Sequence, residues 1–291
     1  AASRKGVHSI EHLGPGIPLF ACCSSHHVEV HEAIRSQPSR SIPAIRPEFL
    51  RTLIERAATP LLKRVIVNPA NLTRSGDAAI LAGAAASFDL DRARSLAGHF
   101  VQDGTWNVPT LIRMKSEYLC DAPEFTESDE LRFVSAKALA GWRKANERYA
   151  KLSPAVRGAL RGTYGRLLEL TSVLADAGAP MLTGSDVCGA GWLVPGFALH
   201  HEFDELAAAG LSPLKVLQMA TSDAGAYLGQ PDTIGRLVRG APADLVVLSG
   251  DPLDRVENLH RIDAVVRGGR YLDRNELDAI ITRAESDRPA F

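Results

Sequence analysis

The segment "APMLTGSDVCGAGW" (residues 179–192) gives the strongest indication of the fold. A short apolar run, Met181 and Leu182, leads directly into Thr183-Gly184-Ser185-Asp186, and a glycine-rich loop without further charge follows. An aspartate after a strand is most often a turn residue. A functional carboxylate at the end of a strand would have the same local sequence. The rest of the chain provides the evidence that separates these two interpretations.

Strand-like and helix-like patterns alternate upstream and downstream of this segment. "GVHSIEHL" (6–13) and "TWNVPTLI" (105–112) are typical of short strands, and helices are favoured after each of them. Such alternation predicts parallel βα units. The predicted helices are 47–58, 78–86, 89–104, 128–150, 154–177, 195–210 and 212–229, together with one that begins after the loop at residue 20.

The last part of the chain has a different pattern. "GRLVRGAPADLVVLSGDPL" (235–253) and "IDAVVRGGRYLD" (262–273) contain short runs of Val and Leu separated by Gly, Pro and Asp turns. This pattern predicts a small antiparallel β element. We therefore expect a βα part over residues 1–230 and a separate β segment with a C-terminal tail over 231–291.

Composition excludes several classes of function. The chain has 291 residues, 45% of them hydrophobic and 23% charged, with a formal net charge of -1. These values are ordinary for a soluble globular protein and do not favour nucleic acid as a partner. No apolar run reaches the roughly 18 residues of a membrane helix. The first residues contain no apolar signal core, so the cytoplasm is slightly favoured and an exported form stays open. The four cysteines follow no CxxC pattern and are expected to be reduced thiols.

Three separated pieces then line up in order: "GVHSIEHL", "TWNVPTL" and "MLTGSDVCGAGW". They are followed by "HEFDELAAAGLSPLKVLQMATSDAGAYLG" and "TIGRLVRGAPADLVVLSGDPL". Together they resemble the amidohydrolase superfamily, in particular its imidazolonepropionase-like and prolidase-like branch. The resemblance implies an α/β fold, namely part of a (β/α)8 TIM-type barrel (about strands 6–8) and part of a small β-sandwich. About 80 residues between the first two pieces lie outside it.

The resemblance also implies site residues at the ends of the strands. His12 falls on the strand-6 position, where the family has a histidine that binds the second metal or the substrate. Asp186 falls on the strand-8 position, where an aspartate binds metal and acts as the general base. We further predict Thr110, His200 and Trp192 as substrate-binding residues, although a purely structural or surface role is the alternative for each.

The expected cofactor is a divalent metal, most simply zinc, with one or two ions in the complete protein. Zinc accepts histidine nitrogen and carboxylate oxygen, and it lowers the pKa of a bound water towards about 7. The family's strand-1 His-x-His pair, strand-4 bridging residue and strand-5 histidine do not occur in this chain. We therefore expect it to be the carboxyl-terminal part of the fold, completed by a missing N-terminal segment or in a homo-oligomer. A second zinc candidate is the cluster of His26, His27 and His31.

The predicted function is hydrolysis of a C–N bond in a small molecule: an amide, a cyclic amide or a small dipeptide. The alternatives are a non-catalytic relic or scaffold of the same fold, and a deaminase of the same superfamily. One geometric expectation tests the whole interpretation. His12, Thr110 and Asp186 should lie at the same end of adjacent parallel strands, with His12 and Asp186 converging on one pocket.

Overall fold

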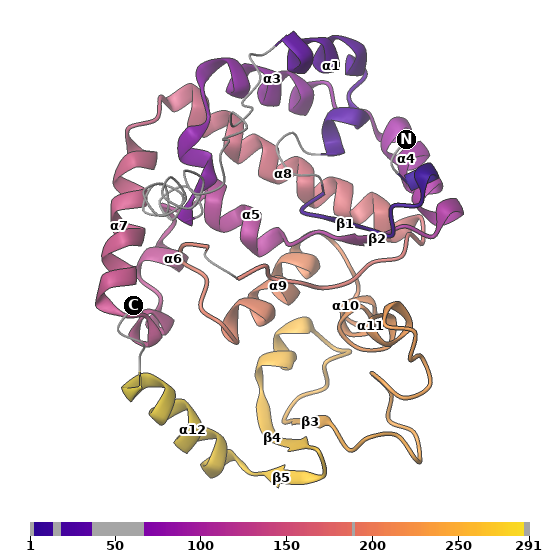
Figure 1. Cartoon of the computed structure of the whole chain (residues 1–291), viewed down its shortest axis with the longest axis vertical. Coiled ribbons are helices and arrows are strands. Elements are labelled where there is room, and N and C mark those ends of the chain that lie inside the picture. The colour runs from indigo at the N-terminus through magenta and orange to yellow at the C-terminus, as the bar shows by residue number, and fades with distance from the viewer. Residues whose placement is uncertain (1–2, 14–18, 37–66, 188–189, 288–291) are drawn as a thin grey trace, which may run out of the picture.

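The computed structural model describes residues 3–13, 19–36, 67–187 and 190–287 (Figure 1). The helix predicted at 47–58 lies outside the described residues. The helices are α1 (His27–Ser36), α3 (Ser75–Ala86), α4 (Leu90–Asp103), α5 (Leu111–Tyr118), α6 (Pro123–Thr126), α7 (Ala136–Ala150), α8 (Pro154–Asp176), α9 (Phe197–Ala208), α10 (Pro213–Ala220), α11 (Ser222–Tyr227) and α12 (Arg274–Ser286). Short 3-10 helices are η1 (Ser3–Lys5), η2 (Leu19–Cys23), η3 (Pro69–Leu72), η4 (Asp129–Phe133) and η5 (Val256–His260).

Three extended segments lie side by side and run parallel. Strand β1 (Ser9–Glu11) pairs with β2 (Trp106–Val108) in parallel register. On the other side of β2, Asn107 forms a parallel bridge with Met181. The backbone of Asn107 makes both bonds of that bridge, donating to the Pro180 carbonyl at 2.9 Å and accepting from the Leu182 N–H at 3.0 Å. The three predicted strand pieces are therefore neighbours in space in their order along the chain.

These extended segments are shorter than the sequence predicts. The piece at 105–112 leaves the sheet after Val108, because Pro109 has no N–H and Thr110 adopts a left-handed φ of 49°. Leu111 then begins helix α5, so residues 111–112 were wrongly predicted as strand. The piece at 179–186 pairs only at Met181, and the backbone becomes left-handed at Asp186 (φ 43°). The described residues form a mixed α/β structure without a closed barrel.

The predicted helices are present where the chain is described, and most of their boundaries follow from capping residues. Ser153 caps the first turn of α8 and Pro154 is its first residue. Gly104 ends α4 with a left-handed φ of 64°. The predicted helix at 128–150 is divided into η4 and α7, since Ser135 begins a new helix by accepting from the Ala138 N–H.

Helix α8 forms the centre of the hydrophobic core. Its buried leucines, including Leu160, Leu167 and Leu170, face a layer made by α3, α4 and α5. In Figure 1 this long helix runs above β1 and β2, α5 lies to the left of the strands, and α9 lies below them. The core therefore fixes α5 and α9 next to the ends of the strands.

The last strands form a separate sheet. We call residues 245–286 the C-terminal lobe, in which β3 (Leu245–Leu248), β4 (Ile262–Arg267) and β5 (Arg270–Leu272) are antiparallel in the order β3-β4-β5. This is the antiparallel element that the sequence predicts. Helix η5, between β3 and β4, packs against α9 and so connects the lobe to the rest of the molecule.

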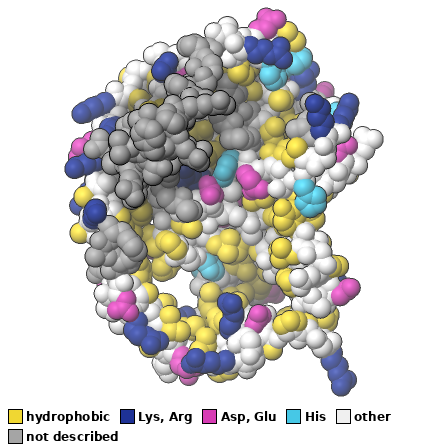
Figure 2. Space-filling model, viewed as in Figure 1, with side chains coloured by type: hydrophobic (Ala, Val, Ile, Leu, Met, Phe, Trp, Pro, Cys, Tyr) yellow, Lys and Arg dark blue, Asp and Glu magenta, His cyan; other side chains and the backbone are white. Residues whose placement is uncertain are grey.

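Several large hydrophobic side chains of the C-terminal part are exposed, among them Leu237, Val246 and Tyr271. Figure 2 shows hydrophobic side chains over much of the lower half of this face. Among the described helices, none is long and apolar enough to cross a membrane.

Candidate active site

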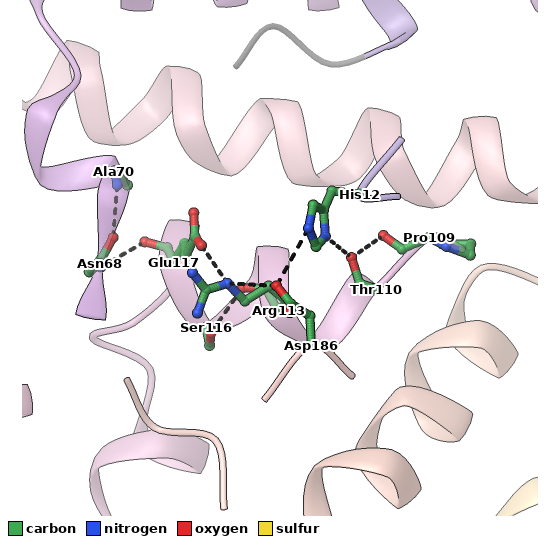
Figure 3. A network of polar contacts seen from close by, with 9 residues as sticks. All are labelled: His12, Asn68, Ala70, Pro109, Thr110, Arg113, Ser116, Glu117 and Asp186. Carbon is green, nitrogen blue, oxygen red and sulfur yellow. Dashed lines mark hydrogen bonds and ion pairs between the residues drawn. The ribbon is translucent and has the colours of Figure 1, made fainter. Parts of the chain in front are cut away.

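Three side chains from the ends of the parallel segments meet at one place (Figure 3). The Nε2 atom of His12 lies 3.4 Å from Oδ2 of Asp186. On the other edge of the ring, Nδ1 of His12 lies 2.6 Å from Oγ1 of Thr110. The structure thus brings together His12, Thr110 and Asp186 as the sequence leads us to expect, while their chemical roles remain predictions.

All three residues have a strained backbone. The φ angles are 59° at His12, 49° at Thr110 and 43° at Asp186. Left-handed φ values are uncommon for residues other than glycine, and a β-branched residue such as Thr110 is a true outlier. Such strain costs of order 1–3 kcal/mol per residue and is concentrated at functional sites. Its occurrence at three adjoining strand ends favours a functional role for this place.

A chain of hydrogen bonds determines which nitrogen of His12 carries the proton. The Thr110 hydroxyl donates to the Pro109 carbonyl at 2.8 Å, so its oxygen is left to accept from His12 Nδ1–H. In the neutral ring Nε2 then has a lone pair, and it faces the carboxylate of Asp186. Two acceptors that face each other at 3.4 Å can share a cation, either a proton or a metal ion.

A buried ion pair adjoins this carboxylate. Arg113, on the first turn of α5, places Nε 3.8 Å from Asp186 Oδ2 and 2.7 Å from Glu117 Oε1. Both Arg113 and Glu117 are buried. Burial raises the pKa of Glu117 to about 7; the Arg113 charge acts to lower it and the Asp186 charge to raise it. Behind the pair, Asn68 donates to the Glu117 carbonyl at 3.1 Å.

Arg113 and Glu117 are not among the site residues that the sequence predicts. A strand over 105–112 hides the helical i,i+4 spacing of Arg113 and Glu117. Had α5 been predicted to begin at Leu111, that spacing would have suggested an ion pair. Burial of the pair is a consequence of packing that the spacing alone does not reveal.

The other two predicted substrate-binding residues lie in different surroundings. Trp192 is buried and donates from Nε1 to Oδ1 of Asn146 on α7 at 2.9 Å, with its ring 5.7 Å from that of Trp142. His200, on α9, lies against the rings of Phe203 and His260. Burial, followed by the charge of His260, lowers the pKa of His200. None of the contacts described for these two residues includes His12 or Asp186, and their roles stay predictions.

The pair formed by His12 and Asp186 has the chemistry of part of a metal site. Zinc bonds of about 2.1 Å in tetrahedral geometry separate two ligand atoms by about 3.4 Å, which matches the separation observed here. Within the ranges that the structure describes, no group of three or more potential ligands converges on one point. His12 and Asp186 therefore fit two positions of a metal site, and further ligands would be needed to complete it.

The alternative zinc cluster near α1 has local partners instead. Nδ1 of His31 lies 2.6 Å from the His27 carbonyl, and its Nε2 lies 3.8 Å from Sγ of Cys22. These contacts favour a structural role for His31. In the described part of the chain Cys22, Cys23 and Cys120 are free thiols.

Comparison with known proteins identifies the relatives of this chain. A family model described as "Amidohydrolase family" matches residues 167–272, which include Asp186, α9 and the sheet of the C-terminal lobe. The resemblance to the amidohydrolase superfamily is confirmed. No curated protein matches.

The similar solved structures include amidohydrolases and an Xaa-Pro dipeptidase. A bottromycin amidohydrolase is 25% identical with a TM-score of 0.57, and the match covers 90% of this chain and 56% of that one. An Xaa-Pro dipeptidase with bound methionine is 18% identical with a TM-score of 0.44, over 67% of this chain and 43% of that one. Another amidohydrolase is 27% identical with a TM-score of 0.42, and the match covers 67% of this chain and 42% of that one. The chain thus spans about half the length of these structures.

Proposed function

We propose that this chain contributes His12 and Asp186 to the active site of a metal-dependent hydrolase that cleaves C–N bonds in small molecules. The observation that carries the proposal is the convergence of an imidazole nitrogen and a carboxylate oxygen, 3.4 Å apart, on strained strand ends. The match to the amidohydrolase family and the likeness to bottromycin amidohydrolase support C–N hydrolysis as the reaction class.

The proposal includes a partial (β/α)8 barrel. Each of the three parallel segments is followed in the chain by helices, as in consecutive βα units, and the candidate residues follow the carboxyl ends of the segments. Functional groups of such barrels lie at that end. We assign residues 1–230 to the barrel part, and 231–291, with its three-stranded sheet, to a segment of a β-sandwich and a tail.

The chain's own residues prepare the site in three ways. Thr110 fixes the ring of His12 so that Nε2 is the ligand atom. Arg113 brings a buried positive charge to within 3.8 Å of Asp186 and thereby orients that carboxylate. Asp186, at the end of its segment, would take a proton from the attacking water and pass it to the leaving nitrogen. A divalent metal, when bound, would supply the acidity of that water.

The decisive experiment uses the gene product that contains these residues, expressed at the full length of its reading frame. It is loaded with zinc or manganese and assayed on N-acyl amino acids, Xaa-Pro dipeptides and cyclic amides. We expect release of free amine from at least one class, dependent on the metal. A protein that releases ammonia from an aminopurine or aminopyrimidine instead would be a deaminase. A well-folded protein that turns over no substrate would be a non-catalytic relic, and either result would overturn the proposal.

A further inference from the structure

Helix α9 contains a carboxylate that is fully buried. Glu202 has no exposed surface, and its Oε2 accepts a hydrogen bond from the Ile112 N–H at 2.7 Å. Ile112 is the second residue of α5, so this N–H is one of the donors that a helix leaves without an internal partner. A side chain from a different helix therefore caps α5.

The residue that would ordinarily provide this cap is occupied elsewhere. Thr110 stands at the N-cap position of α5, where a threonine hydroxyl usually accepts from the second or third N–H of the helix. Here it makes no such bond. Its hydroxyl contacts His12 Nδ1 and the Pro109 carbonyl instead.

We propose that Glu202 is a positioning residue: by capping α5 in place of Thr110, it frees the threonine hydroxyl to hold the imidazole of His12. The inference extends the proposed function, in which His12 is a metal ligand. Glu202 touches neither His12 nor Asp186 in any described contact, so it acts through Thr110. The same first turn of α5 also contains Arg113, which contacts Asp186. A shift of this turn would therefore disturb both candidate ligands.

The hydrogen bond from the Ile112 N–H to Oε2 is important for Glu202, because Oε1, the other oxygen of this buried side chain, has no hydrogen-bond partner within the described residues. A buried carboxyl group is costly unless it is hydrogen-bonded. Burial raises the pKa of Glu202 to about 8, against the effect of the Ile112 and Leu111 N–H groups. The acid is thus largely protonated at neutral pH and can still accept through Oε2. A glutamine, which is neutral and has the same shape, should preserve the cap.

The test follows His12 directly by NMR, without metal or substrate, in protein labelled with ¹³C and ¹⁵N at histidine. The ring signal is assigned with His12→Gln, and Thr110→Val shows how it changes when the Thr110 contact is lost. We expect Glu202→Leu to reproduce the Thr110→Val change, including loss of the Nδ1–H signal. Glu202→Gln should keep the native signal.

Two further variants separate positioning from general packing. Glu205→Gln is the matched control, because Glu205 is also a buried carboxylate on α9 but contacts Lys115 and Tyr164 rather than the first turn of α5. It should leave the His12 signal unchanged. If Glu202→Leu does not fold, Glu202→Asp withdraws the carboxyl by one methylene and should shift the signal part of the way. The double variant of Glu202→Leu with Thr110→Val should show no further change at His12.

Folded Glu202→Leu or Glu202→Asp protein with a native His12 signal would overturn the inference. An equal response to Glu205→Gln would do the same. Hydrolysis is assayed separately: Glu202→Leu should lower kcat about ten- to a hundredfold with little change in KM, as supporting residues of metal ligands do. If the NMR result holds and no variant or parent hydrolyses a C–N bond, the proposed function fails while the positioning role stands.

Discussion

Two regions of the molecule combine histidines with carboxylates, and they differ in backbone and in pairing. At the strand ends, His12 and Asp186 have left-handed φ angles and face each other as two acceptors in the neutral state of the ring. On α9 and η5, Asp204 has a contact with each of two rings, at 2.9 Å to His260 Nε2 and 3.9 Å to His201 Nδ1. His201 also contacts Glu130 at 2.8 Å.

The difference shows how the same residue types serve two purposes. The second region, which we call the docking cluster (Glu130, His201, Asp204 and His260), has regular backbone. Its contact between His260 and Asp204 connects the C-terminal lobe to α9. The strand ends combine backbone strain with two acceptors that can share a cation. Strain that the local sequence does not require is the feature that separates a candidate active site from a structural salt-bridge cluster.

The largest expected effect comes from removing the site carboxylate. Asp186→Asn keeps the shape but removes a charged ligand and a proton acceptor, so turnover by the full gene product should fall about a hundred- to ten-thousandfold. Circular dichroism should show an unchanged fold. The matched control is Asp204→Asn in the docking cluster, which should keep nearly native turnover; equal losses in both variants would remove the distinction between the two regions.

Metal binding provides the second test. The described residues offer two converging ligands, whereas a catalytic zinc site has about three from the protein. We expect residues 1–291 alone to bind no zinc tightly, to hydrolyse nothing and to associate through exposed apolar side chains such as Leu237. Atomic absorption after gel filtration measures the metal. Stoichiometric zinc in active monomers would mean that further ligands exist within this chain.

A smaller effect is expected from the docking cluster itself. Asp204→Asn weakens the contacts to His201 and His260, but these side chains are more than a third exposed, so the loss of unfolding free energy should be about 1 kcal/mol or less. Urea denaturation measures it. Asp223→Asn, which removes a carboxylate paired with Lys215 on α10, is the matched control. A much larger loss from Asp204→Asn than from Asp223→Asn would show that docking determines global stability.

The smallest effect is the response of the docking cluster to pH. The nearby carboxylates of Asp204, at 3.9 Å, and Glu130, which is hydrogen-bonded to the ring, raise the pKa of His201 to about 9, above its ordinary value near 6.5. The stability from this charge is therefore complete below about pH 6.5 and is lost as pH rises through about 9. The urea midpoint of the parent protein should therefore fall between pH 6.5 and 9.5. In the His201→Gln variant this fall should be smaller.

The buried carboxyl group of Glu202 also makes the protein less stable as pH rises, because burial raises its pKa. The Glu202→Gln variant measures this contribution separately from that of His201. The stability that depends on protonated Glu202 is lost mainly between about pH 4.5, the ordinary pKa, and pH 8, the raised pKa. If His201→Gln has the same pH profile as the parent, the charge of His201 does not contribute to the unfolding free energy.

The sequence predicts a large part of this structure because many elements have local signals. Ser153 with Pro154 marks the start of α8, and Gly104 marks the end of α4. The positions of His12 and Asp186 could be predicted because each follows a short apolar strand. Their convergence then follows from the parallel arrangement of neighbouring segments.

What the sequence does not predict depends on contacts between distant elements. The strand at 105–112 was predicted too long, since the apolar residues Leu111 and Ile112 suit either a strand or a buried helix start. Glu202 lies 90 positions from Ile112, and no local pattern connects a helix cap to an acid on another helix. Arg113 and Glu117 were missed for the related reason that charged residues on a helix are usually solvated.

The strained threonine has a consequence for how this protein would respond to selection. A glycine at position 110 would accept the left-handed backbone without steric cost. It would also remove the buried hydroxyl that holds His12. In a library randomised at this position, survivors chosen for catalysis should retain threonine or serine in spite of the backbone angle. The backbone and the imidazole of His12 thus favour different residues at position 110.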